Sequence, residues 1–263
     1  MLVKSMSGLR VAALYGFRPH MLGLCGPKEA LEQRLLLKFL QGKLSHRQIL
    51  PVIKKFKGAY PYYCLIAKKN KIRTGPFNKK VVEAYWIGNK LLDKVTTDDL
   101  KKMVKENFSG PGLLNKNKAA KKAGKISAGS KPHHSFHVLV IGSVTGSVDF
   151  RNTKLKDLCR VGWGKVIKKF KVPRPRPIRQ PADEGGQNSK FKVLVEYQPL
   201  VGEKKIKLGK PIKKEIIWDK EITPSLKIGD FVSFHWNWLV QILNQEDVIN
   251  LKKYTLNTLN CLK

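Results

Sequence analysis

The spacing of apolar side chains changes along the chain, and the first 108 residues have the spacing of helices. Apolar residues recur there at every third or fourth position, as on one face of an α-helix. The clearest run covers 28–41, and Pro27 stands before it at a position suited to start a helix. This pattern predicts a domain of four or five packed helices over residues 1–108. Further runs cover 45–57, 77–93 and 97–107.

Residues 109–132 interrupt this spacing. The segment is rich in Gly, Lys, Ala and Ser and contains few apolar residues. Such a composition is typical of a solvated connection rather than of a packed element. We therefore expect a flexible linker or loop here.

From residue 133 onward the pattern is that of strands. Short runs of β-branched and aromatic residues are separated by turn residues, and helical spacing returns near the end of the chain. A Pro- and Gly-rich stretch at 172–189 is predicted to be an exposed insertion between two strands. Residues 133–263 thus predict a small OB-like β-barrel with C-terminal helices, which makes the chain an α+β protein. The predicted strands are 134–142, 146–150, 160–170, 190–197, 204–208, 213–218 and 230–236.

The formal net charge of +33 raises the question of a nucleic-acid partner. Of the 52 basic residues only ten are arginine, and the excess is spread over both halves of the chain. A surface that binds nucleic acid specifically concentrates its charge and favours arginine, which contacts phosphate through two N–H groups. The charge therefore predicts nonspecific attraction to polyanions. A basic RNA- or DNA-binding barrel stays an alternative, with stacking platforms at Trp163, Trp236 and Trp238.

Neither a membrane segment nor a secretion signal is evident. No apolar run approaches the roughly 18–20 residues that cross a bilayer, and Lys4 and Arg10 interrupt the apolar runs at the start. The four cysteines are far apart and form no Cys-x-x-Cys pair, which disfavours a disulfide scaffold and a zinc knuckle. We expect a cytoplasmic protein.

Two segments of the β part contain residues suited to bind a metal. Residues 159–166 carry Cys159 at the entry of a strand, and residues 228–235 lead from a Gly-Asp turn into a strand that ends on His235. Three predicted strands lie between them, so a barrel can return the last strand beside the first and bring Cys159 near His235. A thiolate and an imidazole together suit iron better than a carboxylate site would.

These two segments resemble the hydrogenase assembly chaperones of the HypC/HupF family. The family's Cys-x-x-x-x-Gly-x-Val opening is matched by Cys159, Gly164 and Val166, and its Gly-Asp-x-Val-x-x-His strand by residues 229–235. The resemblance covers residues 157–260. It implies that the cysteine and histidine hold the iron of the nickel-iron site while it acquires cyanide and carbonyl ligands. It also implies a partner, the hydrogenase large-subunit precursor or another maturation protein.

The chain departs from that family because its cysteine is internal and Trp163 replaces a proline. An N-terminal helical domain would supply partner contacts that the smaller relatives lack. The whole chain is also similar to an uncharacterised prokaryotic family with matching segments at 22–27, 133–137 and 232–236. That similarity implies an association with nickel-iron hydrogenases.

Two further groups are candidates to join the metal site. If 134–142 is a strand, His133 and His137 share one face while His134 points the other way. Cys25 precedes Gly-Pro at a predicted helix start, where the helix dipole would lower the pKa of its thiol. Buried structural roles are the alternatives for these histidines and for Cys25.

The motifs together predict a noncatalytic maturation factor that binds iron and hands it to a partner protein. A metal-dependent enzyme is a second alternative to this function. It would require the histidine cluster and Cys25 to converge with a carboxylate such as Glu83 or Asp149. The predicted metal ligands are Cys159, His235, His133, His137 and Cys25.

Overall fold

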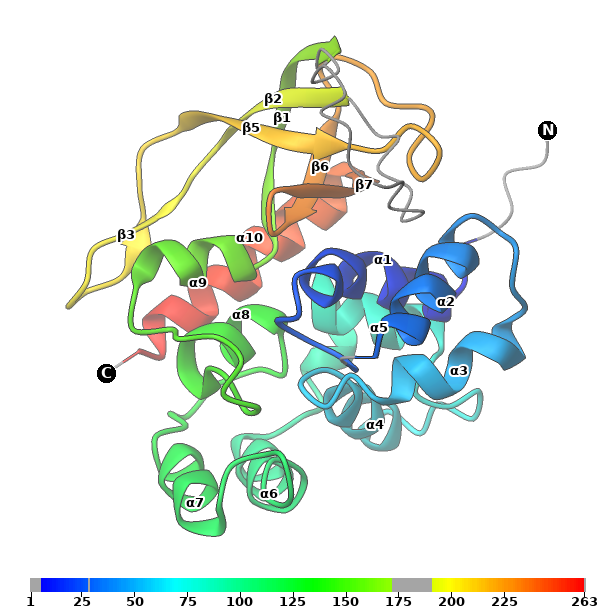
Figure 1. Ribbon diagram of the computed structural model, residues 1–263. Coiled ribbons are helices and arrows are strands. Elements are labelled where there is room, and N and C mark those ends of the chain that lie inside the picture. Colours follow the sequence, from blue (N-terminus) through cyan, green and yellow to red (C-terminus); the bar gives the residue numbers. More distant parts are fainter. Residues whose placement is uncertain (1–5, 28, 172–190, 263) are drawn as a thin grey trace.

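The computed structural model describes residues 6–27, 29–171 and 191–262, and it confirms the predicted α+β class. Helices from the first part of the chain lie on one side of a closed β-barrel (Figure 1). Among the described residues, no helix combines the length and the apolar character that crossing a membrane requires. The first helices are α1 (Gly8–Met21), α2 (Ala30–Leu40), α3 (His46–Lys54), α4 (Tyr60–Lys69), α5 (Lys79–Trp86), a 3₁₀ turn (Lys90–Leu92), α6 (Thr97–Asn107) and α7 (Lys116–Gly124).

α1 lies at the centre of the helical part and touches α2, α3 and α5 as well as two strands of the barrel. Ser7 caps its first turn by accepting a hydrogen bond from the Arg10 backbone N–H at 3.3 Å. Most of its residues are buried, because the helix is packed on several sides. A helix that is apolar nearly all round has no amphipathic spacing, so the sequence pattern does not predict it.

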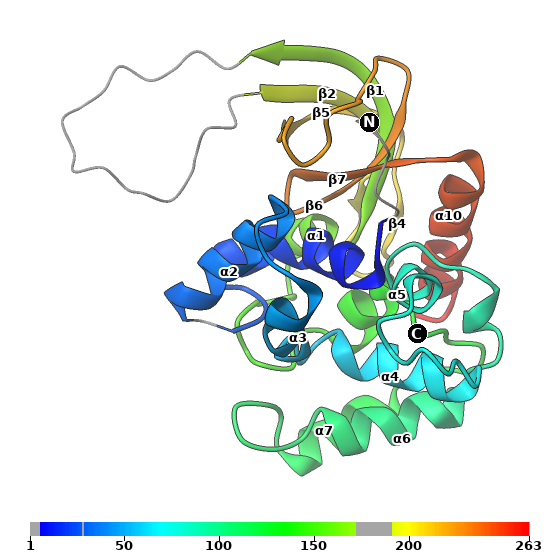
Figure 2. The same ribbon diagram turned by 90° about the vertical axis from the view of Figure 1, so that its right-hand side faces the viewer.

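The predicted linker at 109–132 contains a helix instead of a flexible loop. Asn115 caps the first turn of α7, and Ala119 and Ala123 are buried where α7 packs against α6. Alanine is the strongest helix former, and its small side chain allows two helices to approach closely. Segment 109–132 therefore has few large apolar residues because alanines form the contact between α6 and α7. This helix pair lies at the end of the molecule away from the barrel (Figure 2).

The predicted strands at 134–142 and 146–150 are not formed. Residues His134–Phe136 make one α-helical turn, α8, which continues as a π-helix over His137–Ile141. The segment is buried on nearly every side, and its β-branched residues favour strands only by propensity, which tertiary packing overrides. The next helix, α9 (Thr153–Cys159), starts at the capping residue Asn152. Cys159 therefore ends a helix, whereas the sequence predicts it at the entry of a strand.

Five strands form a closed barrel in the order β1-β2-β5-β7-β6. β1 pairs with β6, so the predicted strand at 230–236 lies beside the predicted strand at 160–170. The segment 238–243 forms a strand, β7, and is not part of the C-terminal helices. The predicted insertion at 172–189 lies outside the described residues. The strands are β1 (Gly162–Lys171), β2 (Phe191–Tyr197), β5 (Ile212–Trp218), β6 (Phe231–His235) and β7 (Trp238–Leu243), with β3 (Leu200–Val201) and β4 (Lys207–Leu208) paired separately.

The helical part and the barrel share one large apolar core. It runs from α1 through α6 to β7 and to the last helix, α10 (Gln245–Asn260), which begins with a capping box between Asn244 and Asp247. A second, smaller cluster fills the barrel interior, and it includes Val195 and Phe234. Because the larger core crosses from helices to strands, the surface between them is a packed interior that can hold a buried site.

Candidate metal centre

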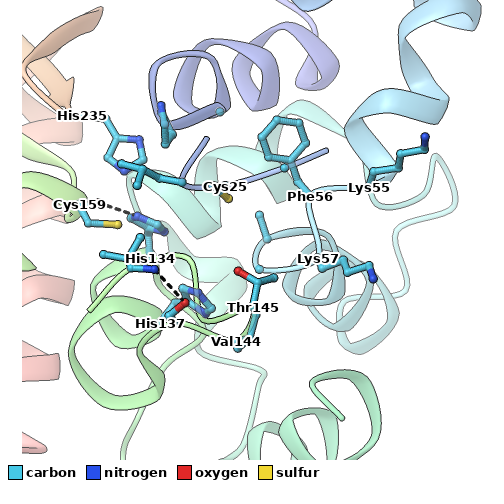
Figure 3. Close-up of a pocket in the computed structure, with 18 of the residues that line it drawn as sticks. Cys25, Lys55, Phe56, Lys57, His134, His137, Val144, Thr145, Cys159 and His235 are labelled. Carbon is cyan, nitrogen blue, oxygen red and sulfur yellow. Dashed lines mark hydrogen bonds between the residues drawn. The ribbon is translucent and has the colours of Figure 1, made fainter. Parts of the chain in front are cut away.

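Three side chains from three elements converge between the helices and the barrel. They are His134 of α8, Cys159 at the end of α9 and His235 at the end of β6. Their potential ligand atoms all lie within 4.8 Å of one another, and all three residues are buried. Figure 3 shows the two imidazoles and the thiol at one end of a cavity. The barrel thus brings Cys159 beside His235, as the pairing of its first and last strands predicts, and adds a histidine from the helical side.

The ring of His235 has one nitrogen in a hydrogen bond and the other without one. Its Nδ1 donates a hydrogen bond to the Tyr15 carbonyl at 2.8 Å, so the lone pair is on Nε2. That Nε2 is buried and forms no hydrogen bond of good geometry with the described residues. Burial lowers the pKa of His235 to about 4, against smaller opposing effects of the Tyr15 and Cys159 backbones. The ring is therefore neutral at physiological pH, as a metal ligand must be.

His134 is held between Cys159 and Tyr85. Its Nε2 lies 2.8 Å from the Cys159 carbonyl, which can only accept, so Nε2 carries the hydrogen. Its Nδ1 lies 3.0 Å from the Tyr85 hydroxyl. Burial, and then the neighbouring His235 and His137, lower the pKa of His134 well below its usual value. Nε2 is the nitrogen on the Cys159 side of the ring, and Nδ1 faces away toward α5.

The Cys159 thiol is protonated in this environment. Burial raises its pKa far above the usual range, and the Cys25 thiol adds to that effect. The Trp236 indole N–H lies close to the sulfur and lowers the pKa in part; this N–H has no oxygen or nitrogen acceptor among the described residues. Metal binding here would displace one proton, and the indole N–H is placed to stabilise the resulting thiolate.

The turn that follows His235 has an unusual backbone. Trp236 and Asn237 both adopt positive φ angles, of 52° and 59°, which are strained for a bulky residue such as tryptophan. The pair forms the tight connection between β6 and β7, the kind of turn that matches strand twist. The backbone N–H of Trp236 donates to the Leu158 carbonyl at 2.9 Å, so the turn is tied to the end of α9. This hydrogen bond joins the residues next to Cys159 and His235 and so keeps these two side chains close together.

The π-helix determines which histidines face the site. In the predicted strand His133 and His137 share a face, but in the observed helix His134 and His137 do, with ring centroids 6.2 Å apart. π-helical segments are rare and occur frequently at functional sites. Lys122 donates to the last carbonyl of this one, at Ile141. The strand prediction therefore paired His137 with His133, which is wrong. The spacing of three residues between His134 and His137, which places both on one face of a helix, is the sequence feature that could have indicated the correct pair.

His133 and His137 have structural partners. His133 caps α8, with its Nδ1 3.3 Å from the Ser135 backbone N–H, and stacks on Tyr254. It is not part of the converging group. The His137 Nδ1 lies 3.2 Å from the Tyr62 hydroxyl, and its ring lines the cavity beside the group. Burial lowers the pKa of each to about 3, so both are neutral.

The cavity beside the three residues has a volume of about 580 Å³, and Cys25 lines it. Lys55 and Lys57 lie at the end away from the histidines (Figure 3). Burial raises the pKa of Cys25 to about 11, so the predicted lowering is wrong. The physical reason is distance, because the next helix begins only at Ala30 and its dipole falls off within one turn. Cys25 faces the same space as Cys159 but is outside the converging group.

Neither alternative function finds its required geometry in the residues named for it. Trp163 and Trp236 are buried and Trp238 is half-buried, so they offer no exposed platform for bases. Glu83 and Asp149 do not line the cavity; Glu83 pairs with Lys79, and Asp149 with Arg151.

One family model matches almost the whole chain. It is described as "Family of unknown function (DUF6390)" and matches residues 4–172 and 186–263. No curated protein and no solved structure matches the chain.

Proposed function

The chain belongs to this family of unknown function, and we propose that it is a noncatalytic metal carrier that holds iron and passes it to a partner protein. His134, Cys159 and His235 are the proposed ligands. The observation that carries the proposal is the His235 ring. A backbone carbonyl fixes its Nδ1–H, and its buried Nε2 has no hydrogen-bond partner among the described residues and lies beside a thiol and a second imidazole.

The donor set suits a soft or borderline metal. One thiolate and two imidazoles are typical ligands of iron, zinc and copper, whereas magnesium and calcium prefer oxygen. Three protein ligands leave coordination positions open, and the adjoining cavity gives room for further ligands on that side. A carrier requires such positions, because its cargo must be reached by the protein that receives it.

Protonation makes loading dependent on pH in a definite direction. The pKa values of His134 and His235 are lowered by burial, so both rings are neutral at pH 7. The pKa of Cys159 is raised by burial, so its thiol must lose a proton when metal binds. Affinity should therefore rise about tenfold per pH unit through the neutral range, with release of one proton per metal ion.

The resemblance of residues 157–260 to hydrogenase assembly chaperones supports iron as the cargo. It also supports the hydrogenase large-subunit precursor, or another maturation protein, as the partner. A cytoplasmic location belongs to the same proposal, since a carrier of this kind acts where the precursor is assembled. The N-terminal helices supply His134 with its surroundings and a surface for partner contacts.

The test is anaerobic binding of Fe²⁺ to the full chain, measured by competition with a chelator, with Cys159→Ser and His235→Asn as the variants. Each should weaken binding more than about 100-fold, because losing a ligand costs more than losing a residue that only orients one. Cys64→Ser is the matched control, since Cys64 is a free, partly buried cysteine outside the converging group. Equal affinity in the Cys159 and Cys64 variants would refute the proposal.

A further inference from the structure

The Tyr85 hydroxyl lies between two hydrogen-bonding partners at the back of the metal centre. It is 3.0 Å from His134 Nδ1 and 3.2 Å from the Gly58 carbonyl oxygen. Tyr85 is fully buried on α5, where it stacks on Tyr62 with ring centroids 4.9 Å apart and meets Tyr63 edge-on at 5.4 Å. The ring is held from several sides, so the hydroxyl stays in place while its hydrogen can rotate.

One hydroxyl hydrogen cannot serve both neighbours at once. In the arrangement described above, Nε2 of His134 donates to the Cys159 carbonyl, so Nδ1 has the lone pair and accepts from Tyr85. The Gly58 carbonyl is then a second acceptor within reach of the same hydrogen.

Metal binding at Nε2 reverses the roles of the two ring nitrogens. Nε2 is hydrogen-bonded to the Cys159 backbone oxygen, so to bind a metal it must lose its hydrogen and leave that bond, and a neutral ring then carries a hydrogen on Nδ1. That Nδ1–H needs an acceptor in a buried place, and the nearest oxygen is the Tyr85 hydroxyl. The hydroxyl can accept only if its own hydrogen turns to Gly58.

We propose that Tyr85 is a positioning residue of the metal centre that supports both tautomers of His134. It donates to Nδ1 when Nε2 is bonded to the Cys159 carbonyl, and it accepts from Nδ1 when Nε2 binds a metal, while its hydrogen passes to the Gly58 carbonyl. The hydrogen that leaves Nε2 passes to solvent through the adjoining cavity and Nδ1 takes one hydrogen from solvent, so the ring stays neutral without a net change in protons.

This inference rests on the proposed function, and the first measurement separates the two. The ¹⁵N and ¹H shifts of the His134 ring are recorded in the wild-type protein without metal and with Zn²⁺ alone, which is diamagnetic and binds thiolate and imidazole. We expect the hydrogen on Nε2 without metal and on Nδ1 with Zn²⁺. If Zn²⁺ binds through Cys159 and His235 while His134 keeps its hydrogen on Nε2, the role of Tyr85 is refuted and the carrier proposal stands.

The second measurement uses Tyr85→Phe with Tyr63→Phe as the matched control. Tyr63 is buried in the same aromatic cluster, and its hydroxyl accepts from the Trp86 indole N–H at 2.6 Å without touching His134. Tyr85→Phe should weaken Zn²⁺ binding about 10–100-fold, as expected when the group that orients a ligand is removed, whereas Tyr63→Phe should leave it within about threefold. Equal effects of the two variants would overturn the inference, and absence of Zn²⁺ binding in the wild type would overturn the carrier proposal with it.

Discussion

The barrel interior and the seam between barrel and helices are built from different kinds of residues. The interior is apolar, with side chains such as Val195, Ile216 and Val232. The seam, which we define by Tyr15, His134, Ser135, Ser233, His235 and Thr255, consists of buried groups that form hydrogen bonds. Both are buried, but only the seam has side chains suited to bind a metal. The difference shows that the buried polar side chains of this region lie where the helices meet the barrel, and not inside the barrel.

β6 illustrates how one strand serves both regions. Val232 and Phe234 point into the barrel, and the alternate residues Ser233 and His235 face the helices. The Ser233 hydroxyl lies 2.9 Å from the Tyr15 hydroxyl, and His235 bonds the carbonyl of the same tyrosine. A shift of the strand by one residue would exchange the two sets. The apolar face therefore fixes the register of the polar one.

The largest expected effect is acid unfolding driven by four buried histidines, of which His134 and His235 belong to the seam and His133 and His137 lie beside it in sequence. Below the unfolded pKa of about 6.5, each histidine whose folded pKa is lowered favours unfolding, because the unfolded chain binds more protons. The loss continues until the folded pKa is reached, at about 3 for His133 and His137 and about 4 for His235. With His134 included, the free energy of unfolding should fall by about 4–5 kcal/mol between pH 7 and pH 5.5.

Urea titrations of the metal-free protein at several pH values measure the free energy of unfolding over this interval. A free energy of unfolding that stays constant over that interval would mean that these four histidines titrate normally in the folded chain. That result would remove the contrast between the seam and the barrel interior, which contains no histidine among its described core residues.

The next effect concerns the buried ion pair that joins α9 to the barrel. Arg160 Nε donates to Asp157 at 2.9 Å, and Asp157 also accepts from the Tyr197 hydroxyl and the Leu200 backbone N–H. Arg160→Met would leave a buried carboxylate without its counter-charge, which should cost about 3–5 kcal/mol of unfolding free energy. Urea denaturation measures it. The control Arg151→Met breaks an exposed pair and should change nothing measurable; equal losses would contradict the assignment.

The smallest expected effect comes from a variant that should lower the stability of the seam without changing metal affinity. Tyr15→Phe removes the hydroxyl bonded to Ser233 but keeps the backbone carbonyl that orients His235. Stability should fall by about 1–3 kcal/mol, because the Ser233 hydroxyl is left buried without a partner, and the double change with Ser233→Ala should recover part of it. Fe²⁺ affinity should stay within about twofold of the wild type, and a large loss of affinity would show that the side chain matters to the site.

The barrel could be predicted because its signal is local. Alternating residues in 190–197 and 213–218 indicate strands directly, and the spacing of Cys159 and His235 across a closing sheet follows from them. The helical part was harder to predict at two helices, for different reasons. α1 has no polar face to give a period, and α7 has almost no large apolar residue.

His134 shows why the site could be predicted only in part. Its orientation depends on a helical turn that continues into a π-helix, and propensity favours a strand for the same residues. Reading the segment with period two placed His134 on the wrong face. The partners that fix the ligands, Tyr15 and Tyr85, lie 220 and 49 positions away from the residues they hold. No short-range pattern contains that information.

The hydrogen bond between His235 and the Tyr15 carbonyl has a consequence for folding during synthesis. Its two residues are separated by 220 positions, so the ribosome must add 220 residues after Tyr15 before this hydrogen bond can orient the imidazole. A chain interrupted earlier carries Cys159 but lacks the strand and turn that complete its surroundings. Under the proposed function, a nascent chain would gain its metal-binding geometry only after synthesis has passed His235.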